Sequence, residues 1–473
     1  MTLQMEKEVE EYVEENYIED ITEKTVKQLI FAFEKALLVN SEKRQTNKPE
    51  LFMESEIALN KAIKDLVIIS EDKSFISMLI KLNTVESICS LFDHSNPDIA
   101  FSAIQLVNEL TDAEDAHEQT EHLIESLIEQ NIAKLLVNNL GRYDEEDSDD
   151  RQAVFESLGI FENILSVKPD LAEFILNGTN FLNFLLNRIK SKLNNSNRLY
   201  ATEILSIFLQ YSRSNRLKAL NENAMEIILI QLSSFKKRDP ADPDETELLE
   251  NSFDLICLLL AEPEGKEKFI KDDAISLFIL MLKHNRMARM GTFRTLTFAC
   301  QSPDSSEICQ LFVENGGLPY LFSALMGKGY SKYKAKYKSF SPDEETEYIL
   351  QIISELLNNL TNESAVNRVF KKFDEEGKID QLISQFNFYS KRLFPEVVKV
   401  VSESSYSGLL DKGLFKMQLI AVILCHLCIR SDKRVEIESK MKFDDLKLVL
   451  NEYLAHLDAS EYKDKLEILA SVL

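Results

Sequence analysis

The sequence predicts an all-α protein whose helices stack into a solenoid, and a helix-to-helix corner near residue 316 is the first observation behind this prediction. Gly316 and Gly317 are suited to ending one helix, and Pro319 fits the first turn of the next, where no backbone N–H is needed. Apolar residues then occupy one face of that next helix, at i, i+3 and i+7: Leu318, Leu321 and Leu325. This stretch predicts two helices joined at a tight corner with a buried face.

The corner recurs, and its period is the second observation. Each instance has an apolar anchor followed by apolar residues three and about seven positions later; the anchors are Val85, Ile132, Leu182, Met225, Ile275, Leu318 and Ile379. After Ile132 the pattern slips by one residue, to Leu140. Consecutive anchors are 47, 50, 43, 50, 43 and 61 residues apart. Helical units of this length are typical of armadillo or HEAT repeats, which bury their apolar faces by stacking.

Composition is the third observation. The 473 residues are 45% hydrophobic, but with only 12 glycines and 10 prolines they offer few turns for a sheet protein. We therefore predict an all-α, armadillo/HEAT-like right-handed superhelical solenoid with N- and C-terminal capping helices. No apolar run without a charge reaches about 18 residues, and residues 1–8 are acidic rather than signal-like. We expect a soluble protein with no membrane partner.

The predicted segments follow from where the repeat pattern begins and ends. They are an acidic lead-in that is either a frayed helix or disordered (1–20), N-terminal capping helices (21–84), armadillo-like repeats (85–386), and a linker with C-terminal capping helices (387–473). The first capping helix is expected to start near Thr22, and a polar stretch at 40–48 to separate it from the next helix. An insertion at 327–346 accounts for the longest anchor spacing.

Charge and cysteine content limit the classes of partner. Against 54 basic residues stand 79 acidic ones, a formal net charge of −25. This charge disfavours direct binding to DNA and favours basic protein partners, although solvation of a large surface also explains much of it. The six cysteines are scattered through apolar helical stretches, which is typical of reduced, buried side chains in an intracellular protein.

Two loops carry unusual composition. The loop at 141–150 is strongly acidic and is either a docking site for basic partners or a solvated connector, with the connector favoured. The insertion at 327–346 interleaves lysines with aromatic residues, a composition that can hold phosphates and stack on bases. Because the whole chain is so acidic, an RNA contact is disfavoured. A flexible surface loop, or a loop that contacts the chain's own acidic surface, is the favoured interpretation.

No set of residues predicts catalysis, a metal or a cofactor. His117 and His122 are five positions apart, which places them roughly 140° apart on a helix and prevents shared chelation. Cys425 and Cys428 have the spacing of redox and zinc sites, but they lie in an apolar helix without a second ligand pair nearby in sequence. No phosphate-binding glycine loop, Gly-x-Ser-x-Gly elbow or kinase signature occurs. We expect a protein that is not an enzyme.

The predicted binding surface is the concave face lined by the third helix of each repeat. Armadillo repeats often end this helix with a Leu-x-Asn-Leu pattern whose asparagine holds the backbone of an extended peptide. Asn163 and Asn359 fit the pattern, and Glu109 stands at the matching place in the first repeat. Four residues earlier, where importin-alpha adaptors carry tryptophan, the chain has Gln105, Gly159 and Glu355, so an importin-like array is excluded.

These six positions are the predicted partner-binding residues. Glu109 and Asn163 are the pair expected to hold an arginine- or lysine-rich peptide. In the alternative interpretation, Glu109 is only solvated and Asn163 only ties neighbouring helices together.

Residues 51–63 and 85–111 resemble the beta-catenin-like protein 1 family, a family of armadillo-type nuclear proteins. The resemblance is carried by the Phe-Met-Glu-Ser-Glu run at 52–56, by Leu59 and Asn60, and by residues 106–112. Further support comes from residues 206–210, 231–236 and 411–415. The chain is similar to a divergent member over nearly its full length.

The resemblance implies a non-catalytic, nuclear, spliceosome-associated protein bound to the NineTeen complex. Its implied partners are basic, localisation-signal-like segments of splicing factors, including the Myb-type subunit of that complex, and a homodimer is left open. The fold alone equally suits a cytoplasmic HEAT-type assembly or trafficking scaffold, which is the alternative.

Overall fold

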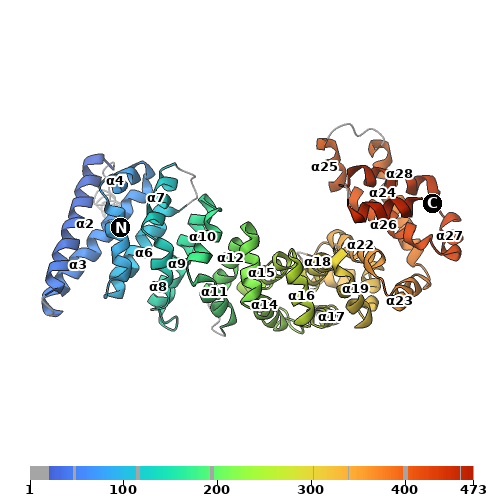
Figure 1. The fold of residues 1–473 in the computed structure, drawn as a ribbon, viewed down its shortest axis with the longest axis horizontal. Helices are drawn as coiled ribbons and strands as arrows, with labels where there is room; N and C mark the ends of the chain where they lie inside the picture. The colour runs from blue at the N-terminus through green and yellow to red at the C-terminus, as the bar shows by residue number, and fades with distance from the viewer. Residues whose placement is uncertain are drawn as a thin grey trace, which may run out of the picture. The chain divides into compact units, whose positions relative to one another are not determined.

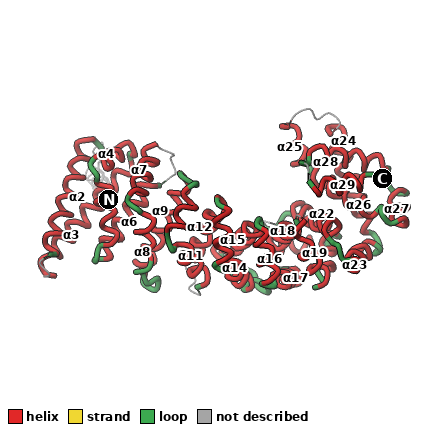
Figure 2. The backbone as a smooth tube through the Cα atoms, viewed as in Figure 1, coloured by secondary structure: helices red, strands yellow, loops and turns green. Residues whose placement is uncertain are grey.

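The computed structural model describes residues 21–45, 49–112, 118–191, 196–301, 303–338, 340–397, 403–458 and 460–471. Every element of secondary structure in these ranges is a helix (Figure 2), which confirms the predicted all-α class. The chain divides into two compact units, Met1–Asn215 and Arg216–Leu473. In the described residues no single helix is long and apolar enough to cross a membrane; one pair, Lys73–Lys81 and Thr84–Asp93, passes that test only in combination and is bent by 85°.

The first unit is a stack of helices in which every third helix packs on its counterpart in the next repeat. Its elements are α2 (Glu23–Arg44), α3 (Pro49–Asp65), η1 (Leu66–Glu71), η2 (Lys73–Phe75), α4 (Ile76–Lys81), α5 (Thr84–Ser90), η3 (Leu91–Asp93), α6 (Pro97–Thr111), α7 (Glu118–Glu129), α8 (Ile132–Leu140), α9 (Ser148–Val167), α10 (Leu171–Gly178), α11 (Phe181–Lys190) and α12 (Ser196–Tyr211). Helices α3, α6, α9 and α12 contact one another in that order, as the blue-to-green part of Figure 1 shows. We call α3, α6, α9 and α12 the inner helices of this unit, and the exposed side of α6, α9 and α12 the first surface.

The second unit contains a row of its own, in which the last two steps span four helices instead of three. Its elements, after α13 (Arg213–Asn221) at the division, are α14 (Ala224–Ser233), α15 (Pro243–Leu260), α16 (Pro263–Lys271), α17 (Ala274–His284), α18 (Arg289–Cys300), η4 (Pro303–Ser305), α19 (Ser306–Glu314), α20 (Leu318–Leu325), α21 (Tyr330–Lys336), α22 (Pro342–Asn359), α23 (Glu363–Phe373), α24 (Lys378–Val397), α25 (Glu403–Asp411), α26 (Leu414–Leu427), α27 (Ser431–Glu438), α28 (Phe443–His456) and α29 (Glu461–Ala470). Helices α15, α18, α22 and α26 pack successively in this unit.

Left-handed backbone marks the corners that the sequence predicted. Five anchors are preceded, two positions earlier, by a residue with positive φ: Asn83, Asn223, Asp273, Gly316 and Gly377. These residue types tolerate the conformation better than others do. At the second corner the positive-φ residue is Asn131, so the matching anchor is Ala133 rather than Ile132. Ala133, Leu136 and Leu140 are buried at i, i+3 and i+7, which explains the apparent slip in the sequence pattern.

Two helices extend further than the sequence predicted. Helix α2 continues to Arg44, so the break before α3 at Pro49 is shorter than the polar stretch expected at 40–48. Asn40 is buried there because its amide hydrogen-bonds the Ser55 hydroxyl at 3.2 Å. Helix α24 likewise continues to Val397, past the start of the linker expected from residue 387. Tyr389 and Leu393, one helical turn apart, are buried and extend its apolar face. The outer limits of the four segments stay predictions.

The insertion between α20 and α22 packs against the chain's own acidic surface, one of the two interpretations favoured from the sequence. It contains α21, from which Lys336 Nζ reaches Asp239 Oδ2 at 2.6 Å. The Tyr337 hydroxyl donates to the other oxygen of Asp239 at 2.8 Å. The buried Tyr333 donates its hydroxyl proton to the carbonyl of Arg286 at 2.9 Å. The insertion is therefore a folded part of the second unit.

Beneath α21 lies a buried ion pair between Arg289 and Glu345. The guanidinium contacts both carboxylate oxygens, with Nη2 at 2.7 Å from Oε2, and the two side chains are only 8% and 0% exposed. The ring centroids of Tyr333 and Phe293 lie 5.3 and 5.6 Å from the guanidinium carbon. Burial raises the pKa of Glu345, and its hydrogen bond and attraction to Arg289 oppose that shift. The insertion thus covers a buried ion pair in which each charge is neutralised by the other.

Replacing Arg289 by methionine should lower the free energy of unfolding by about 3–5 kcal/mol, because the carboxylate of Glu345 would be buried without a partner. The matched control is Arg286→Met, since the Arg286 side chain is 44% exposed and lies 3.8 Å from Asp239. That control should cost no more than about 1 kcal/mol. Urea denaturation followed by circular dichroism measures both, and equal stabilities would contradict the importance of the buried pair.

Candidate partner-binding site

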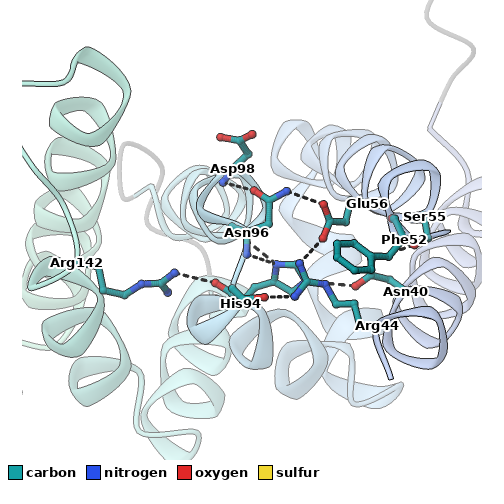
Figure 3. Close-up of polar contacts among 10 residues, drawn as sticks. Asn40, Arg44, Phe52, Ser55, Glu56, His94, Asn96, Asp98 and Arg142 are labelled. Carbon is teal, nitrogen blue, oxygen red and sulfur yellow. Dashed lines mark hydrogen bonds and ion pairs between the residues drawn. The ribbon is translucent and has the colours of Figure 1, made fainter. Parts of the chain in front are cut away.

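The Phe-Met-Glu-Ser-Glu run lies in a polar cluster that joins α2, α3 and the start of α6 (Figure 3). The Arg44 guanidinium lies 5.0 Å from the centroid of the Phe52 ring and forms an ion pair with Glu56. The second oxygen of Glu56 accepts a hydrogen bond from Asn96 at 2.9 Å. Burial pushes the pKa of Glu56 upward, but the hydrogen bonds from Arg44 and Asn96 hold it below its ordinary value.

His94 extends this cluster toward the next repeat. Its Nδ1 accepts a hydrogen bond from the backbone N–H of Asn96 at 3.1 Å, and its Nε2 lies 3.2 Å from Asn40 Oδ1. Burial lowers the pKa of His94 and favours the neutral ring. Arg142, from the loop after α8, donates to the His94 carbonyl at 2.9 Å (Figure 3). These hydrogen bonds and the ion pair connect α2, α3, the start of α6 and the loop after α8, so Glu56 of the run helps to hold the first repeats together.

The asparagines expected to hold a peptide also link neighbouring inner helices. Asn163 on α9 donates to the carbonyl of Asn108 at 3.3 Å, to its side-chain oxygen at 3.1 Å, and to the Thr111 hydroxyl at 3.3 Å. In the second unit Asn359 on α22 donates to the carbonyl of Cys300 at 3.0 Å. Both carbonyls belong to the last turn of the preceding inner helix, where the backbone N–H donors of the helix run out; the Asn108 carbonyl also accepts from the Thr111 hydroxyl at 3.1 Å. The amide protons of these asparagines are thus used within the protein.

Gly159 permits the same link in the first unit. A Cβ atom at this position would lie 2.7 Å from the side-chain oxygen of Asn108, which is closer than real contacts allow. Because glycine leaves this space, the Asn108 amide can lie across α9 and donate to Glu156 Oε2 at 2.7 Å. Gln105, one turn earlier on α6, is partly exposed. The glycine that replaces the importin tryptophan therefore serves helix packing.

Carboxylates and aromatic rings share the exposed side of this surface. Glu109 is exposed, and Glu156 and Glu162 are partly exposed. None of the three forms an ion pair within the part of the chain that the structure describes. The Tyr200 hydroxyl on α12 donates to Glu162 Oε2 at 2.5 Å, and the Tyr200 and Phe155 ring centroids are 4.8 Å apart. Burial, and then the nearby glutamates, raise the pKa of Tyr200, which shows how acidic its surroundings are.

The structure therefore brings four predicted residues together and separates two. Gln105, Glu109, Gly159 and Asn163 lie on the adjacent helices α6 and α9, whereas Glu355 and Asn359 lie in the second unit. Sequence reasoning missed four other residues of the first surface: Phe155, Glu156, Glu162 and Tyr200. The i, i+7 spacing of Phe155 and Glu162 beside Asn163 was a usable signal, but the contact with Tyr200 depends on how α9 and α12 pack.

Glu355 differs from the carboxylates of the first surface because burial shifts its pKa. Burial raises its pKa to about 7, and a hydrogen bond from Asn359 at 2.9 Å only partly offsets this effect. In the described part of the chain Glu355 forms no ion pair. A carboxyl group of this kind is half-protonated near neutral pH.

The acidic loop at 141–150 uses several of its carboxylates internally. Glu145 pairs with the buried Arg188 at 2.8 Å and accepts from Asn197 at 2.9 Å. Asp147 caps the start of α9 by accepting from the backbone N–H of Asp149 at 2.8 Å. These contacts support the interpretation of the loop as a connector.

The Cys-x-x-Cys sequence lies at the C-terminal end of α26, with Cys428 as the residue that caps the helix, and α26 is buried along nearly its whole length. Burial raises the pKa of Cys425 to about 12 and that of Cys428 to about 11. Burial also lowers the pKa of His426 to about 4, and its Nε2 lies 2.7 Å from Asn358 Oδ1. Across the described residues, no three His, Cys, Asp or Glu side chains are grouped to hold a metal ion. His117 lies outside the described residues, so its geometry with His122 stays a prediction.

A sequence model of the family described as "Catenin-beta-like, Arm-motif containing nuclear" matches residues 3–452. The chain belongs to this beta-catenin-like family. The beta-catenin-like protein 1 homolog of Schizosaccharomyces pombe is 30% identical over 464 residues, covering 94% of this chain and 80% of that protein. Human beta-catenin-like protein 1 is 32% identical over 434 residues, covering 86% of this chain and 76% of that protein. The resemblance seen in the sequence is thus confirmed.

Solved structures support the fold of this beta-catenin-like chain. A chain of the SYS-1/POP-1 complex matches with a TM-score of 0.59 and 12% identity, covering 94% of this chain and 75% of that one. A chain solved in work on a phosphorylation switch between cadherin and beta-catenin matches with a TM-score of 0.56 and 12% identity, covering 97% and 84%. At this identity the matches establish an armadillo-type solenoid and nothing finer.

The Glu355→Gln variant should be more stable than the wild type at about pH 8 and should lose most of that advantage at about pH 5. The folded pKa of about 7 exceeds the ordinary 4.5, so folded protein binds the proton more tightly than unfolded protein does. The wild type therefore loses stability as pH rises between these two values, and glutamine removes this loss. Thermal unfolding at both pH values, with Glu109→Gln as the exposed control, measures the effect; identical shifts for both variants would contradict it.

Proposed function

We propose that this beta-catenin-like chain is a non-catalytic scaffold of the pre-mRNA splicing machinery, associated with the NineTeen complex in the nucleus. In this proposal, the surface of α6, α9 and α12 binds basic, localisation-signal-like segments of splicing factors, including the complex's Myb-type subunit. The family description supports the nuclear location. The SYS-1/POP-1 and cadherin–beta-catenin systems are precedents for protein partners on the same fold.

The observation that carries the proposal is the group of carboxylates that lack ion-pair partners among the described residues, on the surface that also carries the Phe155–Tyr200 ring pair. Glu109, Glu156 and Glu162 offer acceptors for guanidinium and ammonium groups. The two rings offer faces on which a guanidinium can stack. The net charge of −25 adds long-range attraction for a basic ligand.

The geometry changes the roles of the predicted residues. Because the amide protons of Asn163 are used by Asn108 and Thr111, the asparagine offers a partner only its oxygen. In the proposal, therefore, the glutamates provide the main attraction, and Asn163, Asn108 and Gly159 hold α6 and α9 in register. Gln105 and Glu109 extend the binding surface along α6, and Glu355 and Asn359 belong to a second site.

Changing Glu109 to lysine together with Glu162 to glutamine should weaken a short peptide of alternating lysine and arginine by roughly 2 kcal/mol, because two charge-assisted contacts are lost. Binding should also weaken steeply with salt, since the attraction is between opposite net charges. Calorimetry with the full chain measures both effects.

The matched control is Glu129→Lys, which changes an exposed glutamate on α7, outside the inner row. It should leave the affinity nearly unchanged. Equal affinities for the double variant and this control, with circular dichroism showing intact helices, would contradict the proposed surface.

Affinity purification of the tagged chain from nuclear extract, followed by mass spectrometry, tests the splicing assignment. Spliceosomal and NineTeen proteins should be recovered with the wild type and reduced with the double variant. Recovery of cytoplasmic trafficking components in their place would favour the alternative scaffold function.

A further inference from the structure

The second unit contains a cavity of about 700 Å³ between α18 and α22 on one side and α26, α28 and α29 on the other. One wall is formed by α18 and α22, which contribute Phe298, Glu355 and Asn359. The opposite wall is formed by α26, α28 and α29, with Tyr453 and Tyr462 among the lining residues. A cavity of this size has room for a long side chain and part of a peptide backbone.

Aromatic rings and one carboxyl group define the chemistry of this cavity. The rings are contributed by four different helices: Phe298, Phe415, Tyr453 and Tyr462. Glu355 faces the same space, and the amide of Asn359 fixes its Oε2 atom at 2.9 Å. Aromatic faces attract cations, and a partly buried carboxylate is stabilised by a cation that makes hydrogen bonds with it.

Among the residues that the structure describes, the charged groups near Glu355 do not form an ion pair with it. Lys266 is buried, and its ammonium group donates to the Gln301 carbonyl and, at 2.8 Å, to the Ser305 hydroxyl. Lys266 and Lys465 lower the pKa of Glu355 only through space, and less than burial raises it. Within the described residues, the hydrogen-bond partner of the Glu355 side chain is Asn359.

We propose that this cavity binds a single arginine or lysine side chain from a basic segment of a partner protein, with Glu355 as the ion-pair partner and the four rings enclosing the cation and its aliphatic stem. The inference rests on the proposed function for the class of partner, but it assigns a separate site. Its consequence is a second anchoring point for basic segments, walled by α28 and α29.

The protonation of Glu355 supplies a direct signature of occupancy. A carboxyl group with a pKa near 7 is about half protonated at neutral pH, and an incoming cation favours the ionised form. Binding should then release a fraction of a proton near neutral pH. The other titratable groups that face the cavity are Lys266, Asp304, Tyr453, Tyr462 and Lys465, so the Glu355→Gln variant is needed to assign the proton.

The test is calorimetry of the full chain near neutral pH in two buffers of different ionisation enthalpy, with the lysine–arginine peptide as the probe. It is run in the Glu109→Lys/Glu162→Gln background, which weakens the first surface. We expect binding with proton release, and Glu355→Gln should abolish the release and weaken binding about 10- to 100-fold. A peptide with citrulline and acetyl-lysine at the same positions should not bind.

Two variants of one ring separate a cation site from a purely structural role. Tyr462→Phe keeps the aromatic face and should bind like its parent, whereas Tyr462→Ala should bind several-fold more weakly. Unchanged affinity and proton release with Glu355→Gln would overturn this inference while leaving the first surface intact. Loss of binding with Glu355→Gln but none from the Glu109/Glu162 change would overturn the first surface alone. No binding to the wild type would overturn both.

Discussion

The packing of the inner helices depends on hydrogen bonds from the side chains of one helix to the free backbone carbonyls at the C-terminal end of the inner helix before it. Asn163 does this for α6 and Asn359 does it for α18, in two different units of the chain. A stacked helix leaves its last carbonyls without donors, and burying them unpaired would be costly. An amide at this position meets the need without introducing charge. The N–H groups of these asparagine side chains are therefore not available to an extended peptide.

Within the described residues, the carboxylates differ in whether an arginine of the chain pairs with them. Glu345 and Glu145 are paired with buried arginines, and Glu56 is held by Arg44. Glu109, Glu156, Glu162 and Glu355 lack such partners within the described residues. The net charge of −25 alone could not distinguish these groups, because an unpaired carboxylate is recognised only from its neighbours in space.

How much the sequence could predict depended on whether the signal was local. The corners were predictable because asparagine, aspartate or glycine stands two positions before the anchor, and the misplaced anchor at Ile132 is corrected by Asn131. Glu109 and Asn163 could be placed on adjacent helices by their position in the repeat. The contacts of Tyr200 with Glu162 and of Lys336 with Asp239 were not predictable, because each joins residues far apart in sequence.

Most solenoids transmit force and unfolding only from one repeat to the next. The insertion around α21 departs from this behaviour, because Asp239 between α14 and α15 accepts from Met287 N at 3.0 Å and from Tyr337 at 2.8 Å. The carboxylate of Asp239 thereby links one edge of three successive repeats. Such coupling between repeats that are not direct neighbours favours their unfolding together and stiffens this edge of the second unit.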